Sequence, residues 1–181
     1  MSEELQTRSF NVRAANSENS TVLKYAQCNP VSSMERLKLE IRRVINDIFV
    51  AARDKDFEAL SELNDWGAGF TKFGDSPPLE RLDGDNARHY DTVLFTNITD
   101  FTCVVEDLRV DIFGDTAVAT CYLNYGGIFV NDYSFEARRV SAKSRATFVL
   151  HHAGGKWRVV HQHLSKLGNG DSALFGEDSP E

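Results

Sequence analysis

The segment KWRVVHQHLSK, residues 156–166, carries a tryptophan, two histidines and a serine at alternate positions near the end of the chain. In a β-strand, successive side chains point to opposite faces, so Trp157, His161, His163 and Ser165 would share one face. A histidine titrates near neutral pH and can serve as a general acid or base. The spacing therefore predicts a polar site on one face of a sheet.

The preceding segment supplies partners for these histidines if the two segments form a hairpin. A three-residue loop at 153–155 predicts these opposed pairs: His151 with Trp157, Thr147 with His161, and Arg145 with His163. Opposed residues share a face, with Cβ atoms roughly 5 Å apart. Arg145 could then hold a carboxylate or enolate oxygen, His163 could act as acid or base, and His161 and Thr147 could orient both. Alternatively, these groups hydrogen-bond to one another and brace the sheet.

Metal and cofactor sites are not expected. His161 and His163 place two imidazoles on one face, but a catalytic zinc site normally has three protein ligands and no third is suitably spaced. The three cysteines, Cys28, Cys103 and Cys121, are scattered and odd in number, which fits neither a metal cluster nor a disulfide framework. The cysteine usage fits a reducing, cytoplasmic environment.

Length and charge exclude several classes of partner. The 181 residues suffice for one domain, and a hydrophobic content of 41% allows a sizeable core. A net charge of -7 argues against a nucleic-acid-binding surface. No apolar run is long enough to span a bilayer, and the N-terminal residues lack the apolar stretch of a secretory signal. Neither nucleic acid nor membrane is an expected partner.

The chain divides into three parts by composition. Residues 1–31 are polar and predict an N-terminal arm, and residues 168–181 predict an acidic flexible tail. The part between them, 32–167, predicts one domain in which helices precede strands. Helices are expected over 32–53, from Asp56 and over 85–95, and an irregular strand over 66–73. Long strands are expected at 102–113, 116–129, 134–152 and 156–167. This order indicates an α+β fold with helices on one face of a bent antiparallel sheet.

Three further residues are candidates for contacts with a small-molecule ligand. Trp66 could line the mouth of a pocket, although a large aromatic residue after a helix also suits the core. Asp75 lies in the turn sequence GDSPP, where it could be a pocket carboxylate or an ordinary turn residue. Tyr122 lies in a predicted strand and suits a pocket or a sheet interface.

Three motifs resemble a known superfamily. Gly155-Lys156-Trp157, followed by residues 160–165, resembles the last strand of SnoaL-like proteins and of the association domain of calcium/calmodulin-dependent protein kinase II. Residues 56–60 resemble the start of the family's second helix, and residues 114–118 its common hairpin. The chain is thus identified over about 33–167 as similar to the SnoaL-like branch of the nuclear transport factor 2-like superfamily, which includes the ketosteroid isomerases and polyketide cyclases.

The resemblance implies a cone-shaped fold in which a curved sheet wraps the long first helix, with a pocket between them and a homodimer interface on the outer sheet face. Isomerase chemistry would require a base carboxylate and a Tyr/Asp oxyanion hole. Asp75 lies near the expected position of the base, but Phe49 stands where a tyrosine would help. The isomerase set is therefore incomplete. In a limonene-epoxide-hydrolase-like reading, Arg109 and Asp111 could act, or they are exposed hairpin charges.

Two functions follow from these observations. The first is a small-molecule-binding protein, catalytic or not, acting on a small hydrophobic or carboxylate-bearing metabolite in an isomerase, cyclase or hydrolase type of reaction. Arg145 and His163 would be its catalytic residues. The second is a non-catalytic association module, a homodimer or a higher homo-oligomer, in which the N-terminal arm wraps a neighbour.

Overall fold

The computed structural model of the chain describes residues 32–131 and 136–167. All of them belong to the structural unit Val31–Glu181. The predicted N-terminal arm and acidic tail lie outside the described residues. In the described part of the chain, no helix is both long enough and apolar enough to cross a membrane.

Each of the three helices begins at a side-chain cap. The Ser32 hydroxyl accepts a hydrogen bond of 3.1 Å from the Glu35 amide at the start of α1 (Ser33–Asp54), as the sequence predicts. Asp56 caps α2 (Phe57–Leu63), and Asp83 caps α3 (Gly84–Asn97), so α3 is longer than predicted. At the end of α1, Lys55 adopts a left-handed conformation that ends the helix.

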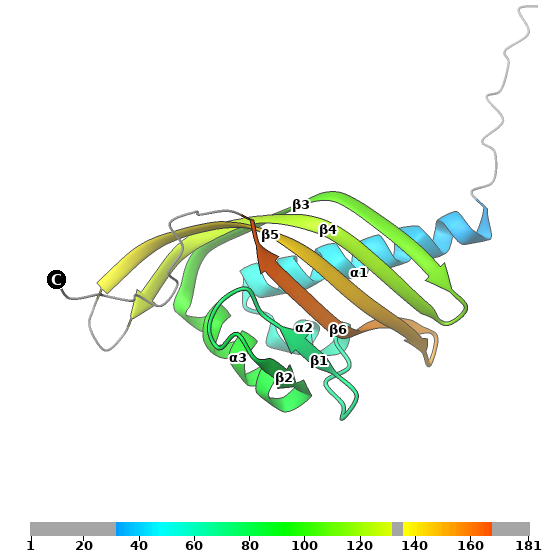
Figure 1. Ribbon diagram of the computed structural model, residues 1–181, viewed down its shortest axis with the longest axis horizontal. Helices are drawn as coiled ribbons and strands as arrows, with labels where there is room; N and C mark the ends of the chain where they lie inside the picture. The colour runs from blue at the N-terminus through cyan, green and yellow to red at the C-terminus, as the bar shows by residue number, and fades with distance from the viewer. Residues whose placement is uncertain (1–31, 132–135, 168–181) are drawn as a thin grey trace, which may run out of the picture. The chain divides into compact units, whose positions relative to one another are not determined.

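Six strands form one open sheet in the order β2-β1-β6-β5-β4-β3. Two are short, β1 (Thr71–Phe73) and β2 (Arg81–Asp83), and four are long: β3 (Ile98–Phe113), β4 (Thr116–Asn131), β5 (Glu136–Ala153) and β6 (Lys156–Lys166). The long strands form the predicted antiparallel meander, whereas β1 runs parallel to β6 and makes the sheet mixed. Figure 1 shows the sheet curving around α1, which confirms the α+β fold with a long helix in a curved sheet.

The core fills the space between α1 and the inner face of this sheet. Ile41 and Ile45 of α1 are fully buried, as the helical spacing predicts. Ala117 and Ala119 of β4 and Ala146 of β5 belong to the same buried cluster. The apolar face of the helix and the inward side chains of the sheet thus form one core.

The β5–β6 hairpin differs from its predicted register in two ways. Its loop has two residues, Gly154 and Gly155, and both have positive φ, as a tight type I′ turn requires. Ala153, not His152, therefore lies opposite Lys156. A β-bulge then leaves Val160 unpaired between the pairs Leu150–Val159 and Val149–His161.

The predicted cross-strand pairs are consequently wrong. His163 pairs with Thr147, His161 with Val149, Arg145 with Ser165, and Trp157 with His152. The bulge also reverses the alternation of side chains, so Trp157 lies on the opposite face of the sheet from His161 and His163. The two histidines still share one face with Arg145 and Thr147, as predicted, although the pairs differ. Trp157 is buried on the inner face, whereas His163 is exposed on the outer face.

Candidate functional site

A narrow cavity lies between α1, α3 and the inner face of the sheet. Its volume is about 80 Å³. Its apolar wall includes four phenylalanines, Phe49, Phe95, Phe101 and Phe148, together with leucine and isoleucine side chains. Seven residues add polar groups to the lining: Lys72, Asp75, Ser76, Tyr90, Asp91, Tyr125 and Gln162. We call it the Asp75 cavity. Its volume of about 80 Å³ is well below the ~300–1,000 Å³ of pockets that enclose whole drug-sized ligands. The cavity therefore suits one small ring or polar head.

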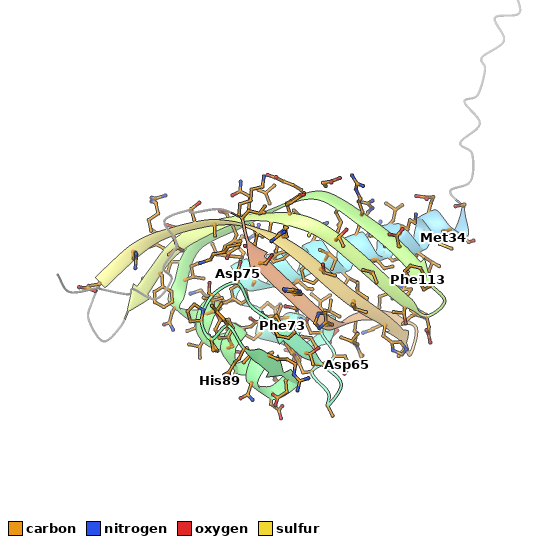
Figure 2. The ribbon with its side chains drawn as sticks, in the orientation of Figure 1. Met34, Asp65, Phe73, Asp75, His89 and Phe113 are labelled. Carbon is orange, nitrogen blue, oxygen red and sulfur yellow. The ribbon has the colours of Figure 1, made fainter. Side chains whose placement is uncertain are left out.

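Asp75 is the polar residue of this cavity that accepts hydrogen bonds from two hydroxyl groups. It follows β1 in the loop labelled in Figure 2. The Tyr125 hydroxyl donates a hydrogen bond of 2.6 Å to its Oδ2 atom, and the Ser144 hydroxyl donates a second bond to the same atom. Among the described residues, the other oxygen, Oδ1, has a single contact, 3.5 Å from the Ser76 hydroxyl. At that distance the contact is weak, so Oδ1 retains capacity to accept a proton or hydrogen bond.

The two tyrosines of the cavity are held in the neutral form. Burial, then the charges of Asp91 and Asp75, raise the pKa of Tyr90 to about 12. Burial, followed by the charge of Asp75 and the hydrogen bond to it, raises the pKa of Tyr125 well above its ordinary value. Both phenols keep their protons at neutral pH, so Tyr125 acts as a hydrogen-bond donor to Asp75.

A buried ion pair forms another part of the wall. Lys72 of β1 binds Asp91 Oδ1 of α3, and their side chains are only 9% and 5% exposed. The ammonium also lies 5.7 Å from the centre of the Tyr90 ring. An ammonium has three donors, so Lys72 can bind Asp91 and still donate to a ligand atom in the cavity.

Four residues of the sequence-predicted site come together, with Tyr122, on the outer face of the sheet. We call Arg145, Thr147, His161, His163 and Tyr122, together with Phe73, the His163 surface. The Thr71 hydroxyl lies 2.7 Å from His161 Nδ1, and the Phe73 ring lies 5.5 Å from the His163 ring, centre to centre. Burial, and secondarily the neighbouring His163, lower the pKa of His161. None of these six residues lines the Asp75 cavity.

The remaining two predicted ligand contacts have different positions. Asp75 lines the cavity, with partners far away in the sequence. Trp66 packs against Phe70 with ring centres 4.6 Å apart and does not line the cavity. Cys103 and Cys121 are free thiols, and no cluster of three or more metal-ligating side chains exists among the residues that the structure describes.

Sequence reasoning did not assign Lys72, Asp91 or Ser144 to a site. A signal for two of them exists in the alternation of the strands. Ser144 precedes Ala146, Phe148 and Leu150 at every second position of β5, and all four are buried. Lys72 likewise shares the buried phase of its segment with Phe70. A polar residue in an otherwise apolar inward series must find a partner, which marks it as a candidate.

The comparisons with known proteins agree with this architecture. The sequence model of the SnoaL-like domain matches residues 41–168, so the chain belongs to the SnoaL-like family, within the nuclear transport factor 2-like superfamily. No match is found among curated proteins.

Solved structures show the same fold at low sequence identity. One is a candidate dehydratase of the nuclear transport factor 2-like family from Streptomyces avermitilis, with 21% identity, a TM-score of 0.62, and coverage of 72% of this chain and 95% of that one. A candidate aromatic ring hydroxylase from Novosphingobium aromaticivorans has 18% identity, a TM-score of 0.61, and coverage of 72% and 89%. The association domain of C. elegans calcium/calmodulin-dependent protein kinase II has 22% identity, a TM-score of 0.56, and coverage of 72% and 96%.

Proposed function

We propose that this protein is a small-molecule enzyme that moves protons at the Asp75 cavity. The observation that carries the proposal is the Asp75 carboxylate, held at Oδ2 by Tyr125 and Ser144 and open at Oδ1, in a mostly apolar wall. A fixed carboxylate in such surroundings is suited to act as a general base. The isomerase, cyclase and hydrolase reactions expected from the sequence, and the dehydration named for the S. avermitilis protein, can all use such a base.

Lys72 supplies the second chemical group of this proposal. When a base removes a proton next to a carbonyl group, negative charge develops on the carbonyl oxygen. A cation or hydrogen-bond donor placed beforehand near that oxygen stabilises the charge. The Lys72 ammonium lines the same cavity as Asp75 and is fixed by Asp91. We assign the proton transfer to Asp75 and the stabilisation of the oxyanion to Lys72.

A carbon acid with a built-in leaving group tests the base without knowledge of the natural substrate. With nitrobenzisoxazole, Asp75 would take the proton from the ring carbon, the electron pair would form the nitrile, and the N–O bond would break to release a coloured phenolate. We expect Asp75→Asn to lower kcat/KM at least about a hundredfold, the usual contribution of a general base. Asparagine can still accept hydrogen bonds from Tyr125 and Ser144, so the fold should persist.

The same assay examines the pair suggested by the sequence. Arg145→Ala and His163→Ala alter the outer face of the sheet and should leave turnover within about twofold of the unmodified protein. If these two variants lose activity and Asp75→Asn does not, the site lies on the His163 surface and the Asp75 assignment is wrong. Equal activity in all variants would mean that neither place is the base.

Self-association through the outer sheet face is a second candidate function. Large apolar side chains are exposed there, among them Val104 at 57%, Tyr122 at 39% and Phe73 at 37%. Exposed apolar patches often mark interaction sites. The fold likeness to the kinase association domain supports the same idea. Native mass spectrometry should show a homo-oligomer that Val104→Asp and Tyr122→Asp dissociate. Deletion of residues 1–31 tests whether the predicted arm contributes.

A further inference from the structure

A second cavity adjoins the Asp75 cavity. It has a volume of about 410 Å³ and is lined by Pro77, Pro78, Tyr90, Val93, Leu94 and Phe129. Its lining is therefore almost entirely apolar, in contrast to the seven polar groups of the first. We call it the Pro78 cavity.

The two cavities share structure. Tyr90 and Leu94, one turn apart on α3, line both of them. The loop after β1 also contributes to both, because Asp75 and Ser76 line the first cavity and the next two prolines line the second. The two cavities are therefore neighbours along α3 and the loop after β1, and the polar groups lie on the side of the first one.

We propose that the Pro78 cavity holds the apolar tail of the substrate whose polar head reaches Asp75. The inference rests on the function proposed above and specifies its substrate class: a molecule with one compact head, able to donate or lose a proton, joined to an apolar body. The volumes support this division, since about 80 Å³ accommodates a small head and about 410 Å³ lies in the usual range of ligand pockets.

The exposure of Val93 fits the same inference. It lies on α3 between the two shared residues and is 46% exposed although it is apolar. A ligand tail in the Pro78 cavity would cover this side chain, and each methylene group that leaves water contributes about 0.8 kcal/mol, or about fourfold in affinity. The tail would therefore account for most of the affinity, while Asp75 would fix its orientation.

A series of para-alkylphenols tests the division between head and tail. Para-cresol, para-propylphenol and para-heptylphenol share a hydroxyl group that can donate to Asp75 Oδ1, and they differ in tail length. With the full chain, calorimetric titration should show the affinity rising by up to about fourfold for each added methylene group. Asp75→Ala should weaken all three phenols by a similar factor because it removes the acceptor for the head.

Val93→Asn separates the tail from the head. It places a neutral amide against the tail and should weaken para-heptylphenol about fivefold while leaving para-cresol within about twofold. Val50→Asn makes the same change at a valine of α1 that is 44% exposed and lines neither cavity, so it should change neither affinity.

Each outcome decides between the proposals. The affinity of the phenols could be the same for every tail length while the binding of para-cresol still depends on Asp75. That result would overturn the tail site and leave the proposed base intact. A gain with tail length that both valine variants reduce equally would also overturn the tail site. If no phenol binds, or if Asp75→Ala has no effect on any of them, the head contact is wrong and the inference is overturned with it.

Discussion

The two faces of the sheet carry polar clusters of opposite character. On the inner face, Asp75, Tyr125 and Ser144 form short hydrogen bonds beside a buried ion pair. On the outer face, Arg145 and His163 are exposed to solvent. A polar group costs free energy to bury unless it is bonded, and it gains strength in surroundings of low dielectric constant. Chemistry that needs fixed groups is therefore favoured on the inner face. The histidine and arginine that the sequence suggests as catalytic residues lie on the outer face.

The largest expected effect is on folding, and it comes from deleting one residue at the bulge or from the strand that pairs with it. Deletion of Val160 removes the unpaired residue, after which regular alternation would still place Val159 inward and His161 outward. We expect the shortened protein to fold, with a loss of about 1–2 kcal/mol. Deletion of Thr147 from the partner strand, where no bulge exists, would turn part of β5 inside out and prevent folding. Circular dichroism and urea denaturation would measure both. An unfolded Val160 variant would contradict the assigned register.

The next largest effect is the difference in stability lost when one partner is removed from an ion pair on each face of the sheet. Lys72→Met leaves the buried Asp91 carboxylate without its cation, so we expect a loss of about 3–5 kcal/mol in the free energy of unfolding. Lys143→Met breaks a pair with Glu106 on exposed side chains, 47% and 39%, and should cost no more than about 1 kcal/mol. Urea denaturation at one pH compares the two. Equal losses would mean that the inner pair is solvated.

Two tyrosines of β4 provide a matched test of a single hydroxyl. Tyr125→Phe removes one donor to Asp75, and hydrogen bonds to charged groups contribute about 1.5–3 kcal/mol. Tyr122→Phe makes the same change on the exposed outer face and should cost less than about 0.5 kcal/mol. Turnover of nitrobenzisoxazole should also fall only in the Tyr125 variant. Two variants with equal stability would show that the inner hydrogen bond is not tightly held.

The smallest expected effect is a change in how stability depends on pH, and it comes from His161 on the outer face. The pKa of His161 is lowered in the folded protein, chiefly by burial, so the unfolded chain binds its proton more readily. This group's contribution to stability is therefore present above the unfolded value of about 6.5 and is lost as the pH falls through the lower folded value. His161→Gln should flatten the decrease in stability between about pH 7 and about pH 5. An unchanged slope would mean that this imidazole is solvated.

The order of elements and much of the fold were predictable because they depend on neighbours in the sequence. The cap at Ser32, the apolar spacing of α1 and the turn at Gly154 and Gly155 each act over a few residues. They indicate helices followed by long strands, which is the observed α+β fold. The same local evidence predicts a turn at Asp75, and the structure places this residue in the loop after β1.

Only the tertiary structure decides which polar residues meet. Asp75 is separated by 50 residues from Tyr125 and by 69 from Ser144, and no spacing along the chain links them. The bulge at Val160 is likewise a property of two paired strands, and one unpaired residue reverses the face of every side chain beyond it. The sequence by itself therefore determines the elements and their inward apolar series. The packing of α1, α3 and the sheet decides that Asp75, and not His163, faces the cavity.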